Sequence, residues 1–331
     1  MHNTIINKGI SVVIPNYNGE GLLARNLPSV YTALKQSGVT YEVIVSDDAS
    51  TDDSLAFIRS NYPDIILISN TTNGGFSVNI NRGIAAAKHE LVLLLNSDIK
   101  LGENYFQSQI GYFDAPDTFG VMGKIIDEGT GHVAESCKYP LPSFFKINHF
   151  KNIAVDTGTN VYSYYLSGAN ALVSREKLNE LGGFNEIFSP FYHEDLDLSL
   201  RAWENGWKCY YDGQAVCTHA VSSTIKSHST KKKIKTISTR NRLLLHYFHL
   251  DSITLYLWHV ITFLSLPFKL IGGKAYYITA YRLYLKKLEA MRAYKTTFKQ
   301  AAIKKGRYVP FITVKNNIKT ALDEVLKAQT K

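Results

Sequence analysis

Short apolar runs alternate with longer amphipathic stretches over the first 95 residues of the chain. The apolar runs cover residues 10–15, 41–46, 65–69 and 91–95, and each has the length and composition of a buried strand. The stretches between them, residues 21–37, 52–61 and 77–88, are expected to be helices. Strands that alternate with helices predict an α/β fold with a mostly parallel central sheet.

The pattern weakens in the middle of the chain. Residues 119–159 are rich in turn-forming positions, and we expect irregular strands and loops there that cover a site. Regular structure is predicted to resume with a strand at 171–173 and a helix at 175–181, followed by a helix at 196–203.

The C-terminal part has a different character. The 17 residues from Ser252 to Phe268 contain no Asp, Glu, Lys or Arg, and basic residues flank them on both sides. A membrane-spanning helix needs about 20 apolar residues, so we expect an amphipathic helical hairpin at a membrane surface instead. The alternative is a helical subdomain packed on the rest of the chain. We therefore divide the chain into an α/β domain, 1–235, and a helical basic extension, 236–331.

Charge supports this division. The chain carries a net charge of +9, but residues 1–219 carry −9 and residues 220–331 carry +18. A basic tail of this kind is typical of contact with an anionic surface, either a membrane or a nucleic acid. The three cysteines have no CxxC spacing, which argues against a disulfide framework or a zinc knuckle. The first nine residues lack an apolar signal segment, so a cytoplasmic location is the simplest expectation.

Polar clusters follow the predicted strands. Asn16-Tyr17-Asn18, Asp47-Asp48 and Asn96-Ser97-Asp98 each come directly after an apolar run. In open α/β sheets, ligands bind at the carboxyl ends of the strands. Neither a GxGxxG motif after the first strand nor a GxxxxGK[ST] motif is present, which disfavours a Rossmann dinucleotide site and a P-loop. The oxygen ligands Asn96 and Asp98 suit Mg²⁺ or Mn²⁺.

The segment Phe191–Asp197 places three carboxylates within four consecutive residues. Crowded carboxylates shift one another's pKa and can provide a general base or a metal ligand. The alternative is the solvated, acidic first turn of a helix. His219 lies within the segment Val216–Ala220, and a single histidine in such a place is more often structural than a ligand.

Taken in order, several segments resemble those of the family 2 glycosyltransferases, which have a GT-A fold, and especially the bacterial branch with rhamnosyltransferases and galactofuranosyltransferases. The resemblance covers roughly residues 10–222. It is carried by Val12–Asn18, Val45–Asp52, Asn73–Phe76, Asn81–Gly83, Leu94–Asp98, Ser167–Ala169, Gly182–Phe184, His193–Asp195 and Arg201-Ala202.

The resemblance implies a role for each matching residue. Asp195 is the expected general base, with Glu194 beside it. Asp98 and His219 are the expected ligands of a divalent metal, Mn²⁺ or Mg²⁺; Asn96 stands at the first position of the family's D-x-D motif, which leaves Asp98 as the main carboxylate ligand. Asp48 is expected to bind the nucleotide base. The full nucleotide-sugar set is Pro15, Tyr17, Asp48, Asn73, Arg82, Asn96, Ser97 and Gly168.

The activity implied is transfer of one sugar, with inversion, from a UDP- or dTDP-sugar to a hydroxyl of a glycan or polyprenyl-linked acceptor. This reaction would serve bacterial surface polysaccharide synthesis at the inner face of the cytoplasmic membrane. A homo-oligomer is compatible with the sequence, and no nucleic acid partner is expected. Two alternatives stay open: a sugar-nucleotide nucleotidyltransferase, and a nucleic-acid-binding protein that uses the basic tail.

Overall fold

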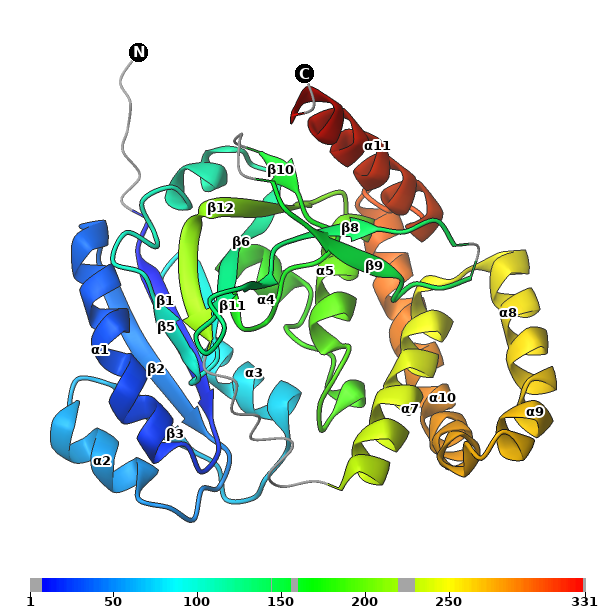
Figure 1. The fold of residues 1–331 in the computed structure, drawn as a ribbon, viewed down its shortest axis with the longest axis horizontal. Helices are drawn as coiled ribbons and strands as arrows, with labels where there is room; N and C mark the ends of the chain where they lie inside the picture. The colour runs from blue at the N-terminus through cyan, green and yellow to red at the C-terminus, as the bar shows by residue number, and fades with distance from the viewer. Residues whose placement is uncertain (1–7, 144, 156–159, 220–229, 330–331) are drawn as a thin grey trace.

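The structure is a computed structural model that describes residues 8–143, 145–155, 160–219 and 230–329. Its main sheet has the strand order β10-β12-β6-β11-β4-β1-β2-β3, with β5 beside β12 and β7 beside β6 (Figure 1). The strands are β1 (Ile10–Asn16), β2 (Tyr41–Asp47), β3 (Ile66–Ser69), β4 (Leu91–Leu95), β5 (Ile99–Leu101), β6 (Thr118–Asp127), β7 (Val133–Glu135), β10 (Val161–Tyr162), β11 (Asn170–Ser174) and β12 (Lys208–His219).

The N-terminal half of the sheet is parallel, as the sequence predicts. β1 pairs in parallel with both β2 and β4, and β2 pairs in parallel with β3. The connecting helices are α1 (Glu20–Ser37), α2 (Ser54–Asn61) and α3 (Phe76–Ala86), within two residues of the predicted bounds at each end. Antiparallel β11 pairs with both β4 and β6, and β6 pairs in parallel with β12, so the sheet is mixed beyond β4.

The sheet buries both of its faces, because successive side chains of a strand point to opposite sides. In β4, Leu91, Leu93 and Leu95 join the apolar cluster formed with α1 and α2. Val92 and Leu94 join the larger cluster on the opposite face. A strand that is covered on both faces therefore reads as an uninterrupted apolar run rather than an alternating one.

The prediction for residues 119–159 is wrong in one respect. The first part of this region forms β6, a ten-residue strand whose first six residues are buried in the middle of the sheet. Its Gly120 and Gly123 break the expected apolar pattern, since neighbouring backbone and side-chain atoms leave no room for a Cβ at either position. The rest of this region, of which residues 144 and 156–159 lie outside the described residues, contains β7 beside β6 and the pair β8 (Cys137–Pro140) and β9 (Phe150–Ile153). β8 and β9 pair antiparallel in a separate small sheet.

Five helices make up the C-terminal part of the chain that the structure describes: α7 (Lys231–His249), α8 (Ser252–Leu264), α9 (Leu266–Ile271), α10 (Ala275–Lys304) and α11 (Phe311–Gln329). The expected domain boundary at 235/236 falls inside α7. Leu244 of α7, Tyr284 of α10 and Ile318 of α11 belong to the same apolar cluster as Leu200 of α5 (Glu194–Glu204). The division into two domains remains a prediction, and the two parts share one core.

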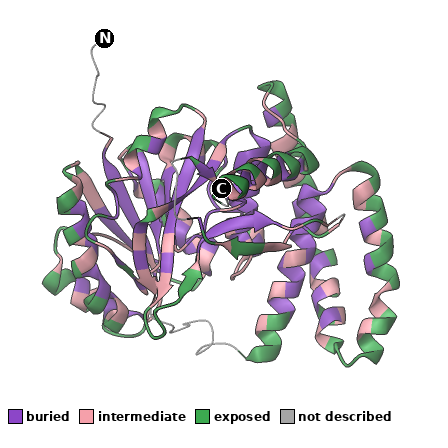
Figure 2. Ribbon diagram, turned by 45° about the horizontal axis from the view of Figure 1, so that its top comes forward, coloured by how far each residue is buried: buried purple, intermediate pink, exposed green. Residues whose placement is uncertain are grey.

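Helices α8 and α9 stand at the edge of the molecule, apart from the sheet (Figure 1). Most of their residues are exposed or only partly buried, as Figure 2 shows. No helix within the described ranges is long and apolar enough to cross a membrane. Residues 252–268 form two consecutive helices, α8 and the first part of α9, joined at Ser265, whose backbone is also in the helical region. The expected placement of this segment at a membrane surface stays a prediction.

Candidate active site

The predicted convergence of polar clusters occurs at the carboxyl ends of β1, β2 and β4. The N–H of Asp48 donates to the carbonyl of Asn16 at 2.9 Å, which joins the first two clusters. Asn79 of α3 donates to the carbonyls of Asn16 and Ser46 and accepts a hydrogen bond from Asn70. Asn79 and Asn70 were not among the predicted site residues, although both are buried in the floor of this cluster.

Asp48 is buried, and its carboxylate organises the loop before α3. Oδ1 accepts from the N–H of Gly74 and Oδ2 from the N–H of Gly75, both at 2.9 Å. The Nδ2 of Asn70 also donates to Oδ1, at 3.3 Å. A carboxylate oxygen can accept more than one hydrogen bond, so a role toward a nucleotide base is compatible with this geometry and stays a prediction.

The other predicted nucleotide-sugar residues line the rim of the same area. Pro15 is the last but one residue of β1 and lies beside Ser46 of β2, and Tyr17 follows directly after the strand, partly buried. Asn73 and Arg82 are exposed, and a guanidinium N–H of Arg82 donates to the Oδ1 of Asn70. Arg82 is therefore linked through Asn70 to Asp48.

Asp98 and His219 lie together although 121 residues separate them. The Nε2 of His219 is 3.0 Å from the Oδ2 of Asp98, and this contact raises the pKa of His219 above its usual range. The pairing arises because β5, which begins one residue after Asp98, is antiparallel to the end of β12, so that His219 is opposite Ile99.

The donor set of this pair fits a divalent metal. The Oδ1 of Asp98 is buried and has no hydrogen-bond partner among the residues described. Carboxylate oxygens suit Mg²⁺ and Mn²⁺, and imidazole is a frequent ligand of divalent transition metals. Within the described ranges, no third His, Cys, Asp or Glu joins the two. The remaining ligands would have to come from substrate phosphate and water, as is usual for Mg²⁺ sites in phosphate chemistry.

The strand ends also approach Asp195. The N–H of Asn96 donates to the carbonyl of Ala169 at 3.1 Å, which places the Asn96–Asp98 segment beside Gly168-Ala169. A Cβ on Gly168 would lie 3.6 Å from the Cβ of Asp195. The start of α5 therefore lies next to the end of β4, as a shared site requires.

Glu194 and Asp195 form an electrostatically coupled pair at the start of α5. Burial raises the pKa of Glu194 above the usual carboxyl range, and the charge of Asp195 adds to the shift. Burial likewise raises the pKa of Asp195, against backbone hydrogen bonds from Leu196 and Gly168 that lower it. A carboxylate with a raised pKa is a stronger base, which is the property that a general base needs near neutral pH. The solvated acidic turn considered above does not occur, since Glu194 is only 8% exposed.

The third carboxylate of the segment, Asp197, has a structural role. Its Oδ2 accepts from the Nε of Arg201 at 2.8 Å, and its Oδ1 is 3.2 Å from the Nε2 of His249. The Nδ1 of His249 in turn lies 3.0 Å from Glu204. All four side chains are buried. Burial raises the pKa of Asp197, but the two cationic partners outweigh it and hold the pKa below the usual value.

Two charged residues near Asp195 were missed because they lie in the region that we predicted to be irregular. Lys138 of β8 is buried, and its Nζ donates to Glu135 and Asn152, each at 2.9 Å. The charge of Glu135 raises the pKa of Asp195, and the charge of Lys138 lowers it. The charge of Glu135 also raises the pKa of His219, so it acts on both halves of the site.

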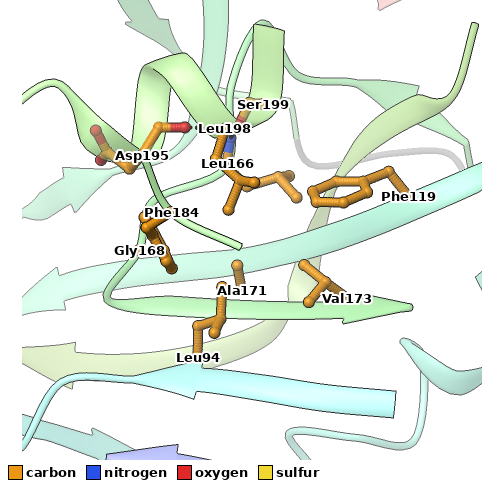
Figure 3. Close-up of a pocket in the computed structure, with 10 residues that line it drawn as sticks. All are labelled: Leu94, Phe119, Leu166, Gly168, Ala171, Val173, Phe184, Asp195, Leu198 and Ser199. Carbon is orange, nitrogen blue, oxygen red and sulfur yellow. Dashed lines mark hydrogen bonds between the residues drawn. The ribbon is translucent and has the colours of Figure 1, made fainter. Parts of the chain in front are cut away.

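An apolar cavity lies behind Asp195 (Figure 3). The side chains of Leu166, Phe184, Phe119 and Val173 point into it, whereas the carboxylate of Asp195 points away. Its volume is about 10 Å³, which is room for one water molecule at most. We conclude that this cavity is a packing void under the site and that a substrate would have to approach the carboxylate from the other side.

Residues 11–182 match the model of the family described as glycosyl transferase family 2. The chain belongs to this family. It is a glycosyltransferase, and the match covers the strand-end clusters and Gly168 but ends before Asp195 and His219.

Two curated relatives illustrate the range of the family. The chain is 25% identical over 247 residues to an N-acetylglucosaminyl-diphospho-decaprenol L-rhamnosyltransferase of Mycobacterium tuberculosis, covering 67% of this chain and 77% of the relative. It is 25% identical over 235 residues to a chondroitin synthase of Escherichia coli, covering 62% of this chain but only 34% of that protein. The chain thus spans about a third of the chondroitin synthase.

Solved structures show the same fold. GalNAc-T7 with UDP, GalNAc and Mn²⁺ superposes with a TM-score of 0.58 at 17% identity, over 74% of this chain and 48% of that one. Residues 1–349 of Staphylococcus aureus TarS, in complex with UDP-GlcNAc, give a TM-score of 0.56 at 17% identity, over 96% and 92% of the two chains. At these identities the likeness extends to the fold alone, which is the GT-A fold predicted above.

Proposed function

We propose that this glycosyltransferase moves one sugar from a UDP- or dTDP-sugar to a hydroxyl group of its acceptor, with inversion, and that Asp195 is the general base. The observation that carries the proposal is the approach of Asp195, through Gly168, to the strand end that leads to the Asp98–His219 pair. This arrangement puts a basic carboxylate beside a candidate site for a nucleotide diphosphate.

The chemistry follows from these positions. Asp195 removes the proton of the acceptor hydroxyl as its oxygen attacks the anomeric carbon of the donor. The bond to the diphosphate breaks on the opposite face of the sugar, and one displacement inverts the anomeric configuration. Asp98 and His219 would hold Mn²⁺ or Mg²⁺, which supplies positive charge against the departing diphosphate. Asp48, with Tyr17 and Pro15, would bind the base.

A donor-hydrolysis screen tests the reaction class. Purified protein is incubated with UDP-, dTDP- and GDP-sugars in Mn²⁺, Mg²⁺ or EDTA, and the released nucleoside diphosphate is measured. We expect metal-dependent release from one donor, and a loss of about 10²–10⁴-fold in Asp195→Asn. Asp64→Asn on the surface is the matched control and should keep full activity. Wild-type turnover in Asp195→Asn would remove this residue from the role of base.

We further infer that the acceptor is a lipid-linked saccharide and that α8 and α9 hold the enzyme at the cytoplasmic membrane surface. The rhamnosyltransferase relative is named for a decaprenol-diphosphate acceptor. Large apolar side chains are exposed on α8 and α9, up to 84% for Ile271 and 75% for Phe268. Lys269 and Lys274 lie beside them and would face anionic headgroups. The exposed apolar residues of this face are Ile253, Tyr256, Leu257, Val260, Ile261, Phe263, Leu264, Phe268, Leu270 and Ile271.

Vesicle co-sedimentation tests the membrane surface. We expect the enzyme to bind vesicles that contain anionic phospholipid and to bind neutral vesicles weakly. Phe263→Ser combined with Phe268→Ser should reduce binding at least tenfold. Ile303→Ser, which changes a similarly exposed residue on α10, is the control and should bind as the wild type does. Equal binding by all variants, or an RNA gel shift in place of vesicle binding, would contradict the assignment.

A further inference from the structure

The loop that leads into α5 has an unusual backbone. Tyr192 and His193 both adopt positive φ, 77° and 73°, immediately before Glu194 and Asp195. Residues other than glycine rarely adopt this conformation, and two in succession persist only where the surrounding structure holds them. The contacts that hold this loop therefore decide where the two carboxylates lie.

On one side, Asn241 of α7 holds the loop. Its side chain is fully buried, and Nδ2 lies within hydrogen-bond distance of three loop carbonyls. It donates to the carbonyls of Phe191 at 2.8 Å and of Tyr192 at 2.9 Å, and it also contacts that of Phe188. A single amide thus satisfies carbonyl groups on either side of the turn, which would be costly to leave buried without a donor.

Arg240, next to Asn241 on α7, holds the same loop, and we call these two residues the clamp. One of its Nη atoms donates to the carbonyl of Ser189 at 2.6 Å and to that of Phe188 at 3.1 Å. Its Nε donates to the Oδ1 of Asn241 at 2.8 Å, which fixes the orientation of that amide. Arg240 is only 7% exposed, and its hydrogen bonds within the described part of the chain go to loop carbonyls and to Asn241 rather than to a carboxylate. The guanidinium group of Arg240 therefore holds the loop backbone directly and also orients Asn241.

On the other side, the loop rests against the start of α3. The N–H of Phe76 donates to the carbonyl of Pro190 at 2.9 Å. Gly75 packs so closely that a Cβ there would lie 2.6 Å from the Cα of Pro190. Because Gly75 also donates to Asp48, the loop lies between α7 and the predicted nucleotide pocket.

We infer that Arg240 and Asn241 are positioning residues for the transfer reaction: they hold residues 188–192 so that Asp195 meets the acceptor hydroxyl. The inference rests on the proposed role of Asp195 as base. A misplacement of about 1 Å can cost about 10²-fold in rate. Loss of the clamp therefore lowers kcat, while donor binding at Asp48 is retained.

The test compares Asn241→Ala with a matched buried asparagine. Asn205, at the far end of α5, donates to the carbonyl of Arg201 at 3.1 Å and does not contact the loop. We expect Asn241→Ala to lower kcat by about 10–100-fold with the donor KM within about threefold of wild type. Asn205→Ala should lower the thermal midpoint comparably and keep kcat within about twofold. Equal kcat in the two variants would overturn the inference.

Two further variants keep the test decisive if Asn241→Ala does not fold. Arg240→Lys retains the charge and some donors and should show a smaller loss of kcat than Arg240→Met; equal losses would count against the clamp. In an Asp195→Asn background, Asn241→Ala should cause little further loss, because it acts through Asp195. Fully additive losses would contradict this. If Asp195→Asn is itself fully active, the proposed function fails; if only the Asn241 variants behave as wild type, the clamp alone fails.

Discussion

Replacement of Arg201 by Met is expected to destabilise the protein strongly, and the structure gives the magnitude. Arg201 is completely buried and forms three hydrogen bonds, to Asp197 at 2.8 Å and to the carbonyls of Leu181 and Gly183 at 2.9 Å each. Removal of one partner from a buried ion pair leaves an uncompensated charge and costs about 3–5 kcal/mol. His249 remains beside Asp197, so we expect the cost to stay within that range.

The free energy of unfolding in urea, measured with the thermal midpoint, tests this value. For a chain of this size, 1 kcal/mol corresponds to about 2 °C, so the midpoint should fall by about 6–10 °C. Arg59→Met on α2 is the control for loss of a surface arginine and should change stability by less than about 0.5 kcal/mol.

A double-mutant cycle separates the ion pair from general packing. Asp197→Asn combined with Arg201→Met should be less destabilised than the sum of the two single variants, by about 0.5–3 kcal/mol, because each single change leaves the other group unpaired. A loss below about 1 kcal/mol in Arg201→Met, or strict additivity, would refute the view that the buried Asp197–Arg201 ion pair contributes to the stability of the protein.

Three further outcomes are expected. Because burial raises the pKa of Asp195, activity should rise with pH through a midpoint above the ordinary carboxyl range. The charge of Glu135 adds to this rise in pKa, so Glu135→Gln should move the midpoint down by about 0.5–1 pH unit in a kcat/KM profile, and an unchanged profile would argue against the influence of Glu135 on Asp195. Asp98→Ala should weaken Mn²⁺-dependent nucleotide binding in calorimetry at least tenfold, whereas a titration like that of the wild type would exclude Asp98 as a ligand. Gly75→Ala should lower the unfolding free energy by about 1–3 kcal/mol, because its φ of 83° and ψ of 174° suit glycine alone and a Cβ would strike Pro190; a neutral result in urea unfolding would mean that the loop can move.

Much of the fold could be predicted because local sequence and global structure agree in the first half of the chain. The apolar run Leu91–Leu95 is buried on both faces, and it forms β4 with the predicted bounds. The prediction failed at β6, where Gly120 and Gly123 interrupt the apolar pattern. Both positions need glycine because atoms of β11, Tyr105 and Ala215 pack against them. These neighbours are not adjacent in the chain, so the local sequence does not indicate that a strand lies there.

The site divides in the same way. The sequence alone determined which residue types follow each strand, and parallel topology then brings Asn16, Asp48 and Asn96 to one edge. Through the family resemblance, the sequence also predicts Asp98 and His219 as metal ligands and Asp195 as the base, and these roles stay predictions.

Only the tertiary structure decided how the three acidic residues of the 194–197 segment differ. Asp197 pairs with Arg201 and His249 in the core, whereas Glu194 and Asp195 form no ion pair with a residue that the structure describes, and burial raises their pKa values. Likewise, the sequence predicts that the basic C-terminal part is a separate extension. In the structure, however, Asn241 of α7 in this part holds the loop before Asp195. The burial and the pKa of a side chain depend on the residues that folding brings into contact with it. The apolar and polar periodicity of the chain predicts helices and strands but does not specify these contacts.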